Sequence, residues 1–499
     1  MESLDKTDKA ILRALQVNAK LTTKELADKV HLSSSPTFDR QKRLEREGYI
    51  KKYVALVDSR KVGNNIIIWC NIRLKQHTHD YIKEFMDAVQ NIEEITDCYN
   101  TSGDFDFLIK GNAVTLQPQT KKLRTMTYQT SNAPFRADIV GSFLRPQEIK
   151  VARAAFENGE IDSEELKTIE DKCIAALISK QKEAGLKVIT DGEYRRSYWH
   201  LDFMWGLNGV EHIELDHGYQ FHGEETTKGS CIVTGKISGE NHPFVEHFKY
   251  VKQFESNGVV ARQTIPSPSQ FYAELFRGEE NTKNTLRFYP DHEVLINDIA
   301  AAYRTVIEEL YAAGCRNIQF DDCTWGMVCD TDFWKTMTGC GYDVEELMHI
   351  YLEVNNKSLE NLPSDLVVNT HVCRGNYHST WAAKGPYDRV APILFAQEKV
   401  NAFYLEYDDE RSGGFEPLKY VPASKKVVLG LITTKNPKLE DRQTIIDRIH
   451  QAAKYIPLER LCLSPQCGFA SCEIGNKLTE EEQWAKIALV QSIANEVWG

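Results

Sequence analysis

Two residues with soft metal-binding side chains stand one residue apart in the stretch NTHVCRG, residues 369–375. His371 and Cys373 follow an apolar run, and side chains at positions i and i+2 of a strand point to the same face. Zinc is held by about four nitrogen, sulfur or oxygen ligands, so this pair needs further ligands from elsewhere in the chain. The structural alternative is a buried histidine beside a packing cysteine.

The elements that must position this pair form a repeating pattern. Short apolar segments with strand character recur along the second part of the chain, and long helical segments separate most of them. This alternation predicts an α/β fold of the (β/α)8 TIM barrel type, with the active site at the C-terminal ends of the strands. The segments are 137–143, 186–193, 259–266, 316–322, 366–373, 402–409, 426–433 and 460–468.

Polar side chains gather at the ends of these segments. Glu406 ends the segment after that of His371, and Cys467 ends the last one. Because strand ends face one another across the mouth of a barrel, these two residues could complete a set of one nitrogen, two sulfurs and one oxygen. The polar residues at the segment ends are Asp191, Glu193, Asp321, Asp322, His371, Cys373, Glu406 and Cys467.

The part of the chain before the barrel has a different character. Residues 1–113 hold 18 Lys and Arg against 17 Asp and Glu, so the acidity behind the net charge of −12 lies in the remainder, which holds 42 against 55. Apolar residues with helical spacing predict three short helices within residues 1–60, in a helix-turn-helix layout. The pattern over 61–113 then predicts strand, helix, strand, turn and strand. Residues 114–134 are polar and aperiodic and are interpreted as a linker to a barrel at 135–499.

Length and composition exclude several classes of protein. A chain of 499 residues favours two domains, and no apolar stretch approaches the roughly 20 residues that a membrane helix needs. We therefore expect a cytoplasmic protein with no membrane association. In that compartment the 12 cysteines are interpreted as core thiols, metal ligands or reactive groups rather than disulfides.

The barrel resembles the catalytic barrel of the cobalamin-independent methionine synthases, in their short single-barrel form. The resemblance rests on DIVGSF, TDGEYRR, QFDD, THVC with LEYDD, and SPQCGF, in that order along 134–499. It implies a zinc-dependent methyltransferase that transfers a methyl group from a 5-methyltetrahydrofolate-type donor to homocysteine and so makes methionine.

The same resemblance implies roles for individual residues. The zinc ligands would be His371, Cys373, Glu406 and Cys467, and the amino-acid substrate would contact Val140, Gly141, Ser142, Glu193 and Asp321. The proton-donating histidine of the family aligns best with Lys435, which could act only with a lowered pKa. His378 is the alternative donor.

Residues 3–113 resemble the Lrp/AsnC transcription regulators through LDKTDKAILRALQ, TTKELADKVHLSSSPTFDRQKRLEREGYIKKY and TSGDFDF. This implies binding to double-stranded DNA through a recognition helix at 33–46, with side chains facing the major groove. Those side chains would be Ser35, Thr37, Arg40 and Arg43. The ligand-binding half is a partial ferredoxin-like α+β domain that ends after its third strand. Its remaining strands could form the interface of a homodimer.

Two alternatives to a methionine-forming enzyme stay open. One is a zinc-thiolate alkyltransferase that uses another donor or another thiol. The other is an Lrp/AsnC-type regulator whose barrel senses an amino acid. Four intact zinc ligands favour an enzyme, because sensing does not require an activated thiol.

Overall fold

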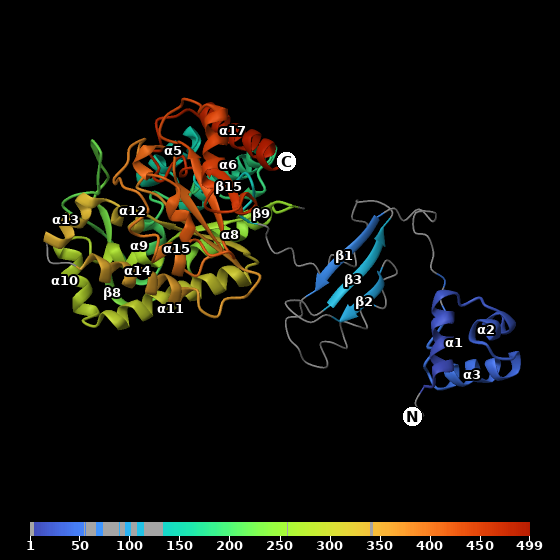
Figure 1. Ribbon diagram of the computed structural model, residues 1–499. Coiled ribbons are helices and arrows are strands. Elements are labelled where there is room, and N and C mark those ends of the chain that lie inside the picture. The colour runs from blue at the N-terminus through green and yellow to red at the C-terminus, as the bar shows by residue number, and fades with distance from the viewer. Residues whose placement is uncertain are drawn as a thin grey trace. The chain divides into compact units, whose positions relative to one another are not determined.

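The computed structural model of the protein describes residues 4–53, 55, 66–72, 89, 95–100, 107–113, 133–256, 258–339 and 343–499. Two compact units, Met1–Met126 and Thr127–Gly499, make up the chain, and each is described by itself (Figure 1). The helix expected over 84–90, apart from Val89, and the linker, apart from its last two residues, lie outside the described residues. Within the described ranges, no helix is both long and apolar enough to cross a membrane.

The first unit begins with three helices, α1 (Lys6–Val17), α2 (Thr23–Val30) and α3 (Ser34–Arg46). Asp5 and Thr22 cap the first two helices, and in each case the third residue of the helix returns a bond to the backbone of the cap. The helical spacing seen in the sequence is confirmed, because one apolar residue or more from each helix enters a shared core. That core holds Ile11, Leu15, Leu26 and Leu44.

The first unit continues with an antiparallel sheet of three described strands, in the order β1-β3-β2. The strands are β1 (Ile66–Ile72), β2 (Ile95–Asn100) and β3 (Phe107–Ala113). Val89, from the segment predicted as a helix, is buried in a small cluster with Phe107. The three strands lie in the segments that the sequence predicted as strands, so that prediction is confirmed.

The second unit is a barrel of parallel strands. Six strands pair in the order β10-β11-β12-β13-β14-β15, and β4 pairs with β9, which only Arg262 separates from β10. Ala137 bridges Leu463 in parallel and so joins the first predicted segment to the last strand. The bounds are β4 (Val188–Ile189), β9 (Val260–Ala261), β10 (Gln263–Pro266), β11 (Asn317–Asp322), β12 (Val367–Val372), β13 (Ala402–Glu406), β14 (Lys426–Ile432) and β15 (Leu461–Pro465).

Every predicted segment therefore contributes to the barrel wall, although 137–143 does so through a single bridge rather than a full strand. The backbone N–H of Phe143 donates to the carbonyl of Gly192, which links this first segment to the second (3.1 Å). The prediction of a TIM barrel is confirmed.

Helices lie outside the strands, with α11 and α14 packed against each other (Figure 1). The helices are α5 (Gln147–Glu157), α6 (Ser163–Glu183), α7 (Leu201–Trp205), α8 (Pro243–Lys252), α9 (Pro268–Leu275), α10 (Gly278–Phe288), α11 (His292–Ala312), α12 (Thr324–Val328), α13 (Thr331–Gly339), α14 (Val344–Ser358), α15 (Leu394–Gln397), α16 (Arg442–Ala452) and α17 (Glu480–Trp498), with the 3-10 turns η3 (Glu410–Ser412), η4 (Glu416–Tyr420) and η5 (Leu458–Arg460). Two antiparallel pairs follow α7, formed by β5 (Asn208–Glu214) with β8 (Gly229–Ser238) and by β6 (Gln220–Phe221) with β7 (Glu224–Glu225).

A buried ion pair fills part of the barrel interior. Arg262 Nη2 lies 3.0 Å from Asp138 Oδ1, and both side chains are fully buried. Tyr404 donates its hydroxyl hydrogen to Asp138 (3.0 Å) and accepts a bond from Arg262 (2.6 Å). The same guanidinium also donates to the carbonyl of Ile139 (2.6 Å). These bonds tie together segments of the wall that are far apart in the sequence.

Removal of one partner should therefore destabilise the barrel. Replacing Asp138 with Asn leaves the buried charge of Arg262 uncompensated, and we expect a loss of about 3–5 kcal/mol in the free energy of unfolding. The measurement is the denaturant midpoint of the barrel transition. Glu148→Gln is the control, because Glu148 pairs with Lys172 at the exposed surface, where solvent screens the pair, and its midpoint should stay near that of the wild-type protein. Equal midpoints for the two variants would contradict a structural role for the buried pair.

Candidate active site

Three predicted metal ligands meet at the carboxyl ends of the strands. Ligand atoms of His371, Cys373 and Cys467 all lie within 4.8 Å of one another, and all three side chains are buried. Both ring nitrogens of His371 lack a hydrogen-bond partner among the described residues. A buried imidazole without a partner beside two thiols is the donor set that zinc prefers. The residues present therefore fit a zinc ion.

The thiols of this group need a cation to ionise. Interaction with Cys323, and then burial, holds the pKa of Cys373 well above its ordinary value. Interaction with Cys373, and then burial, does the same for the pKa of Cys467. A coordinated metal reverses this, since a coordinating thiol loses its proton.

Glu406, the fourth predicted ligand, lies apart from this group. Its Oε1 accepts bonds from Lys435 and Arg411, each at 3.0 Å, and its Oε2 accepts the backbone N–H of Arg374 at 2.6 Å. Burial acts to raise the pKa of Glu406, but Lys435, Arg374 and Arg411 together lower it to about 2. The carboxylate is thus charged, buried and already supplied with donors.

Lys435, which pairs with Glu406, also contacts a second carboxylate. Its Nζ also lies 2.9 Å from Asp408 Oδ2. Burial acts to lower the pKa of Lys435, but Glu406 and Asp408 raise it well above the ordinary value. A proton donor to an amine leaving group needs the opposite shift. The predicted alternative, His378, contacts Glu224 at 2.7 Å.

A cavity of about 880 Å³ opens onto the metal group. Of the predicted substrate residues, Val140, Ser142, Glu193 and Asp321 line it, as do His371, Cys373 and Cys467, whereas Gly141, Glu406 and Lys435 are not among its lining residues. Gly141 lies behind the wall, where a Cβ would come 2.7 Å from Thr264 Cγ2. Glycine at this position lets the chain pass close to β10.

Glu193 presents an unpaired carboxylate oxygen at the cavity. Its Oε1 accepts from Thr264 Oγ1 at 3.1 Å, whereas the buried Oε2 has no partner within the described chain. Its φ of 62° costs a residue with a Cβ about 1–3 kcal/mol, as strained residues at functional sites do. Burial raises the pKa of Glu193, although Arg196 and Arg145 oppose that shift.

Asp321 is the second carboxylate at this end of the cavity. The parallel register pairs it with His371 on the neighbouring strand, and its Oδ1 accepts from Gln319 Nε2 at 2.8 Å. Burial, and then the charge of Glu193, raises the pKa of Asp321 well above its ordinary value. A bound ammonium group would relieve the repulsion between the two carboxylates and pair with both.

Cys323 and His200 are among the cavity residues that the sequence did not predict. Cys323 Sγ lies 3.4 Å from Cys373 Sγ, and its place directly after Asp321 and Asp322 at the end of β11 was a usable signal. His200 is 5 % exposed, and neither of its ring nitrogens makes a hydrogen bond in the described part of the chain, although Nε2 lies 4.0 Å from Glu274 Oε2. Burial lowers the pKa of His200 to about 3.

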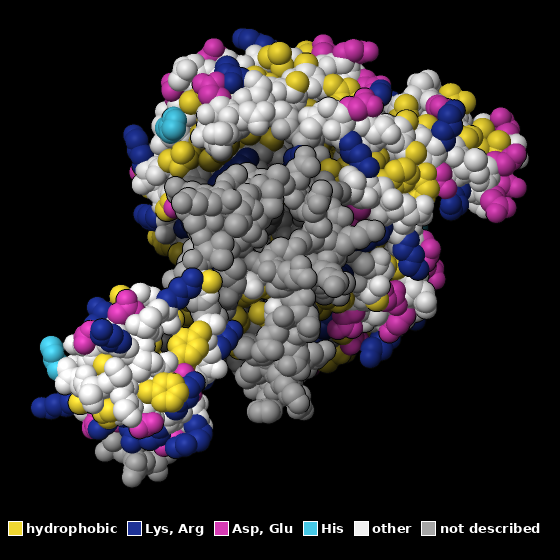
Figure 2. Space-filling view, turned by 90° about the vertical axis from the view of Figure 1, so that its right-hand side faces the viewer, with side chains coloured by type: hydrophobic (Ala, Val, Ile, Leu, Met, Phe, Trp, Pro, Cys, Tyr) yellow, Lys and Arg dark blue, Asp and Glu magenta, His cyan; other side chains and the backbone are white. Residues whose placement is uncertain are grey.

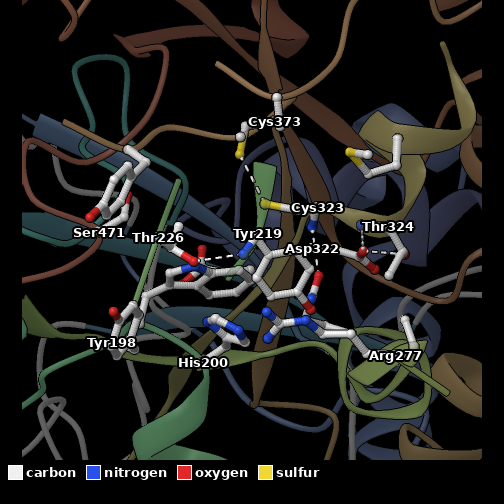
Figure 3. A pocket seen from close by; sticks show the side chains of 18 of the residues that line it. Tyr198, His200, Tyr219, Thr226, Arg277, Asp322, Cys323, Thr324, Cys373 and Ser471 are labelled. Atoms are coloured by element: carbon white, nitrogen blue, oxygen red, sulfur yellow. Dashed lines mark hydrogen bonds between the residues drawn. The ribbon is translucent and has the colours of Figure 1, made fainter. Parts of the chain in front are cut away.

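The aromatic end of the cavity surrounds His200. Trp199 and Tyr219 lie with ring centroids 4.6 Å and 6.0 Å from the imidazole. The guanidinium of Arg277 covers the Tyr219 ring at 3.8 Å. Figure 3 shows Cys323 and Cys373 directed toward each other, with His200, Tyr219 and Arg277 below them in the view. The cavity thus joins a thiol-rich end to an aromatic end.

The predicted DNA contacts require a correction at α3. Thr37 does not face outward, because it is fully buried and its hydroxyl donates to the carbonyl of Ser33 at 3.0 Å. Arg40 is only partly exposed, and its guanidinium lies 2.6 Å from Asp5 and 2.9 Å from Asp8.

Arg43 also contacts Asp8, at 2.5 Å, so the two arginines hold α3 against α1. Ser35 is exposed, as predicted. Phe38, Lys42 and Arg46 are exposed on the same helix, and Lys42 Nζ lies 5.8 Å from the Phe38 ring centroid. Figure 2 shows Lys and Arg side chains interspersed with acidic ones over the visible surface.

Comparisons with known proteins agree with this division of the chain. Residues 135–490 match the family model for the catalytic domain of cobalamin-independent synthase. Residues 4–51 match that for winged helix-turn-helix DNA-binding, and residues 68–117 match the Lrp/AsnC ligand binding domain.

Individual relatives cover the same two parts. YxjH of Bacillus subtilis is 43% identical over 381 residues, which are 76% of this chain and 99% of that protein. A structure assigned as a vitamin-B12 independent methionine synthase from Listeria monocytogenes is 38% identical, with a TM-score of 0.58, over 74% of this chain and 99% of that one. The leucine-responsive regulatory protein of Escherichia coli K12 is 38% identical over 109 residues, 22% of this chain and 66% of that protein.

The barrel with its His371, Cys373 and Cys467 group thus has the fold and the sequence of one enzyme family, and the chain belongs to the cobalamin-independent synthases, with an Lrp/AsnC-like helix-turn-helix segment in front of the catalytic domain.

Proposed function

We propose that the barrel transfers a methyl group from a 5-methyltetrahydrofolate species to homocysteine and so forms methionine. The observation that carries this proposal is the meeting of two features in one cavity. Thiol and imidazole ligands suited to zinc stand at the same end as two buried carboxylates suited to an ammonium group. A substrate with both a thiol and an amine satisfies both features.

The carboxylates, the cavity wall and the metal ligands would each have a separate role. Glu193 and Asp321 pair with the ammonium group of homocysteine and so direct its sulfur toward the metal group. Val140 and Ser142 would form the wall beside the substrate carboxylate, with Gly141 behind it. Zinc held by His371, Cys373 and Cys467 would keep the substrate sulfur as a thiolate, which is the nucleophilic form.

The aromatic end of the cavity would hold the methyl donor. Neutral His200 offers one hydrogen-bond donor and one acceptor, and Trp199 and Tyr219 offer flat apolar surfaces. The departing amine nitrogen must gain a proton when the methyl group leaves. Lys435 is a poor source, because its pKa is raised and it does not line the cavity.

The front unit supports a second proposal, that the protein binds double-stranded DNA through α3. The exposed side chains of Ser35, Lys42 and Arg46 can reach a groove and its phosphates, and the partner of Lys42 is Glu45 of the same helix, at 2.7 Å. Arg40 and Arg43 are instead engaged with carboxylates of α1 and its cap. A regulator whose barrel only senses an amino acid is the rival proposal. A different alkyl donor or thiol is the rival within enzymes, and the paired carboxylates favour an amine-bearing thiol.

The central test combines metal content with turnover of the full chain. We expect about one zinc per chain and methionine formation from homocysteine and 5-methyltetrahydrofolate, offered as mono- and triglutamate. Cys467→Ser should lose zinc and turnover while DNA binding stays intact, because Cys467 belongs to the barrel. Absence of zinc in the wild-type protein, or unchanged turnover in the variant, would refute the metal site. Zinc without turnover on either folate would instead refute the donor.

The ammonium site can be tested by direct binding. Replacing Glu193 with Gln removes a charge-assisted bond, and we expect homocysteine to bind the zinc-loaded protein about 10- to 100-fold more weakly by calorimetry. Zinc content should not change. Glu473→Gln is the matched control, since Glu473 is exposed and contacts Arg153 at 3.4 Å. Equal affinities for the two variants would remove Glu193 from the substrate site.

The DNA proposal is tested at two exposed cations of α3. Lys42→Ala and Arg46→Ala should each weaken binding to a DNA duplex and lower the slope of log affinity against log salt by about one. Lys20→Ala is the control, because Lys20 is exposed but lies between α1 and α2. Unchanged salt slopes in both α3 variants would show that this face does not contact phosphates.

A further inference from the structure

A short hairpin, residues 219–226, forms one wall of the cavity. Its strands are β6 and β7, and Tyr219, Gln220, Phe221, Thr226 and the adjacent Thr227 all line the cavity. Figure 3 shows Tyr219 and Thr226 side by side, where the backbone N–H of Tyr219 donates to Thr226 Oγ1 at 2.8 Å. The hairpin therefore covers part of the space in which substrates would bind.

The root of this hairpin is held by buried groups. Tyr219 donates its hydroxyl hydrogen to Glu274, whose side chain is fully buried on α9. Arg277 covers the Tyr219 ring and donates to the carbonyl of His217 at 3.0 Å. The backbone N–H of Thr226 donates to the carbonyl of Tyr219 at 3.0 Å and so closes the root. The root is thus the fixed end of the hairpin.

The tip of the hairpin is held by contacts at the surface. Glu224 Oε1 lies 2.7 Å from Lys477 Nζ, and its Oε2 lies 2.7 Å from His378 Nδ1. The side chain of Glu224 is 28 % exposed and that of Lys477 is 55 % exposed. Solvent screens contacts of this kind and makes them weak. The tip can therefore be released far more easily than the root.

Backbone and ring contacts place the tip against the loop that follows β12. The backbone N–H of His222 donates to the carbonyl of Trp381 at 2.8 Å, and Thr380 Oγ1 donates to the carbonyl of His222 at 2.7 Å. The His222 and Trp381 rings stack with centroids 4.6 Å apart. Phe221 packs so closely on Gly375 that a Cβ at Gly375 would come 2.9 Å from Phe221 Cε1.

Glu224 also connects the hairpin to both loops that follow cysteines of the metal group. His378 lies in the loop after Cys373, and Lys477 lies in the loop after Cys467. One carboxylate thus holds the hairpin tip to two loops of the barrel rim. Loss of that carboxylate would free the tip from both loops and leave the strands of the barrel wall in place.

We propose that the β6–β7 hairpin is a lid over the cavity, and that Glu224 is the positioning residue that latches it closed. The lid opens when the tip leaves the two loops while the root stays fixed, and substrates and products then pass on this side. Closing returns Phe221 to the cavity wall and excludes water from the reacting groups. The inference goes beyond the proposed reaction, because it concerns access to the cavity whichever methyl donor enters it.

Hydrogen exchange of the full chain, read at single amides by mass spectrometry, tests the latch. Glu224→Gln removes the charge that both partners face, so the His222 amide, which crosses to the loop, should exchange about 3- to 10-fold faster. The Thr226 amide, bonded within the hairpin, should keep its wild-type rate. Glu225→Gln is the matched control and should change neither amide, because Glu225 accepts from the backbone N–H of Gly218 at the root.

Access to the cavity is measured with iodoacetamide, a small thiol reagent, at Cys323, which lines the cavity. Glu224→Gln should speed alkylation of Cys323 by about the factor found for exchange at His222, because both rates follow the population of the open lid. Lys477→Ala should act in the same direction. Its effect should vanish in the Glu224→Gln background, because the two changes break the same contact.

Each contrary outcome overturns a stated part of the inference. Equal exchange at His222 in the wild-type protein and Glu224→Gln overturns the latch. Faster exchange at Thr226 as well would mean that the hairpin unfolds, and unchanged alkylation of Cys323 would mean that its movement does not open the cavity; either result overturns the lid. None of these measurements uses methyl transfer, so failure of the proposed function leaves them interpretable.

Discussion

Closure of a parallel sheet into a barrel is the constraint on which the rest of the catalytic unit depends. The bridge from Ala137 to Leu463 joins the first segment of the barrel to its last strand, and all carboxyl ends then meet at one rim. Residues as distant in sequence as Glu193 and Cys467 thereby line one cavity. Side chains must also fill the closed interior of the barrel. The ion pair of Arg262 and Asp138, with the Tyr404 hydroxyl, fills part of it.

The acidic residues at this rim differ in how many of their carboxylate oxygens already have a hydrogen-bond or ion-pair partner within the protein. Glu406 accepts from Lys435 and Arg411 at Oε1 and from the backbone N–H of Arg374 at Oε2, and it keeps a low pKa. Glu193 has an oxygen without a partner in the described chain, and Asp321 has a raised pKa beside it. A fully paired carboxylate stabilises the site, whereas a partly paired one has binding energy left for a ligand. This difference is the basis of the substrate-binding role proposed for Glu193 and Asp321.

The helix-turn-helix segment distributes its charges in a comparable way. Arg40 and Arg43 meet the carboxylates of α1, and these bonds fix the helix that carries the exposed face. Lys42 and Arg46 remain exposed on that helix. Basic side chains of one helix therefore hold it against α1 at some positions and remain at the exposed surface at others.

Much of the architecture followed from local pattern. Strand-like segments, helical spacing and strand-end polar residues predicted the barrel, the three N-terminal helices and the rim at which His371, Cys373 and Cys467 meet. These features are readable because periodicity reports which face of an element is buried. The place of Gly141 beside the substrate stays a prediction, and the sequence could not show that Thr264 is what excludes a side chain there.

Which side chains contact one another across the fold was decided by the tertiary structure alone. The sequence placed Thr37, Arg40 and Arg43 on an exposed helical face, but contacts with Ser33 and α1 bury or engage them. It gave Glu406 and Lys435 separate chemical roles, whereas the fold brings them 3.0 Å apart as an ion pair. It gave no reason to join Cys323 to Cys373, 50 positions away. Residue type and spacing determine what each side chain can do, and the folded neighbours determine its charge state and which bonds remain free.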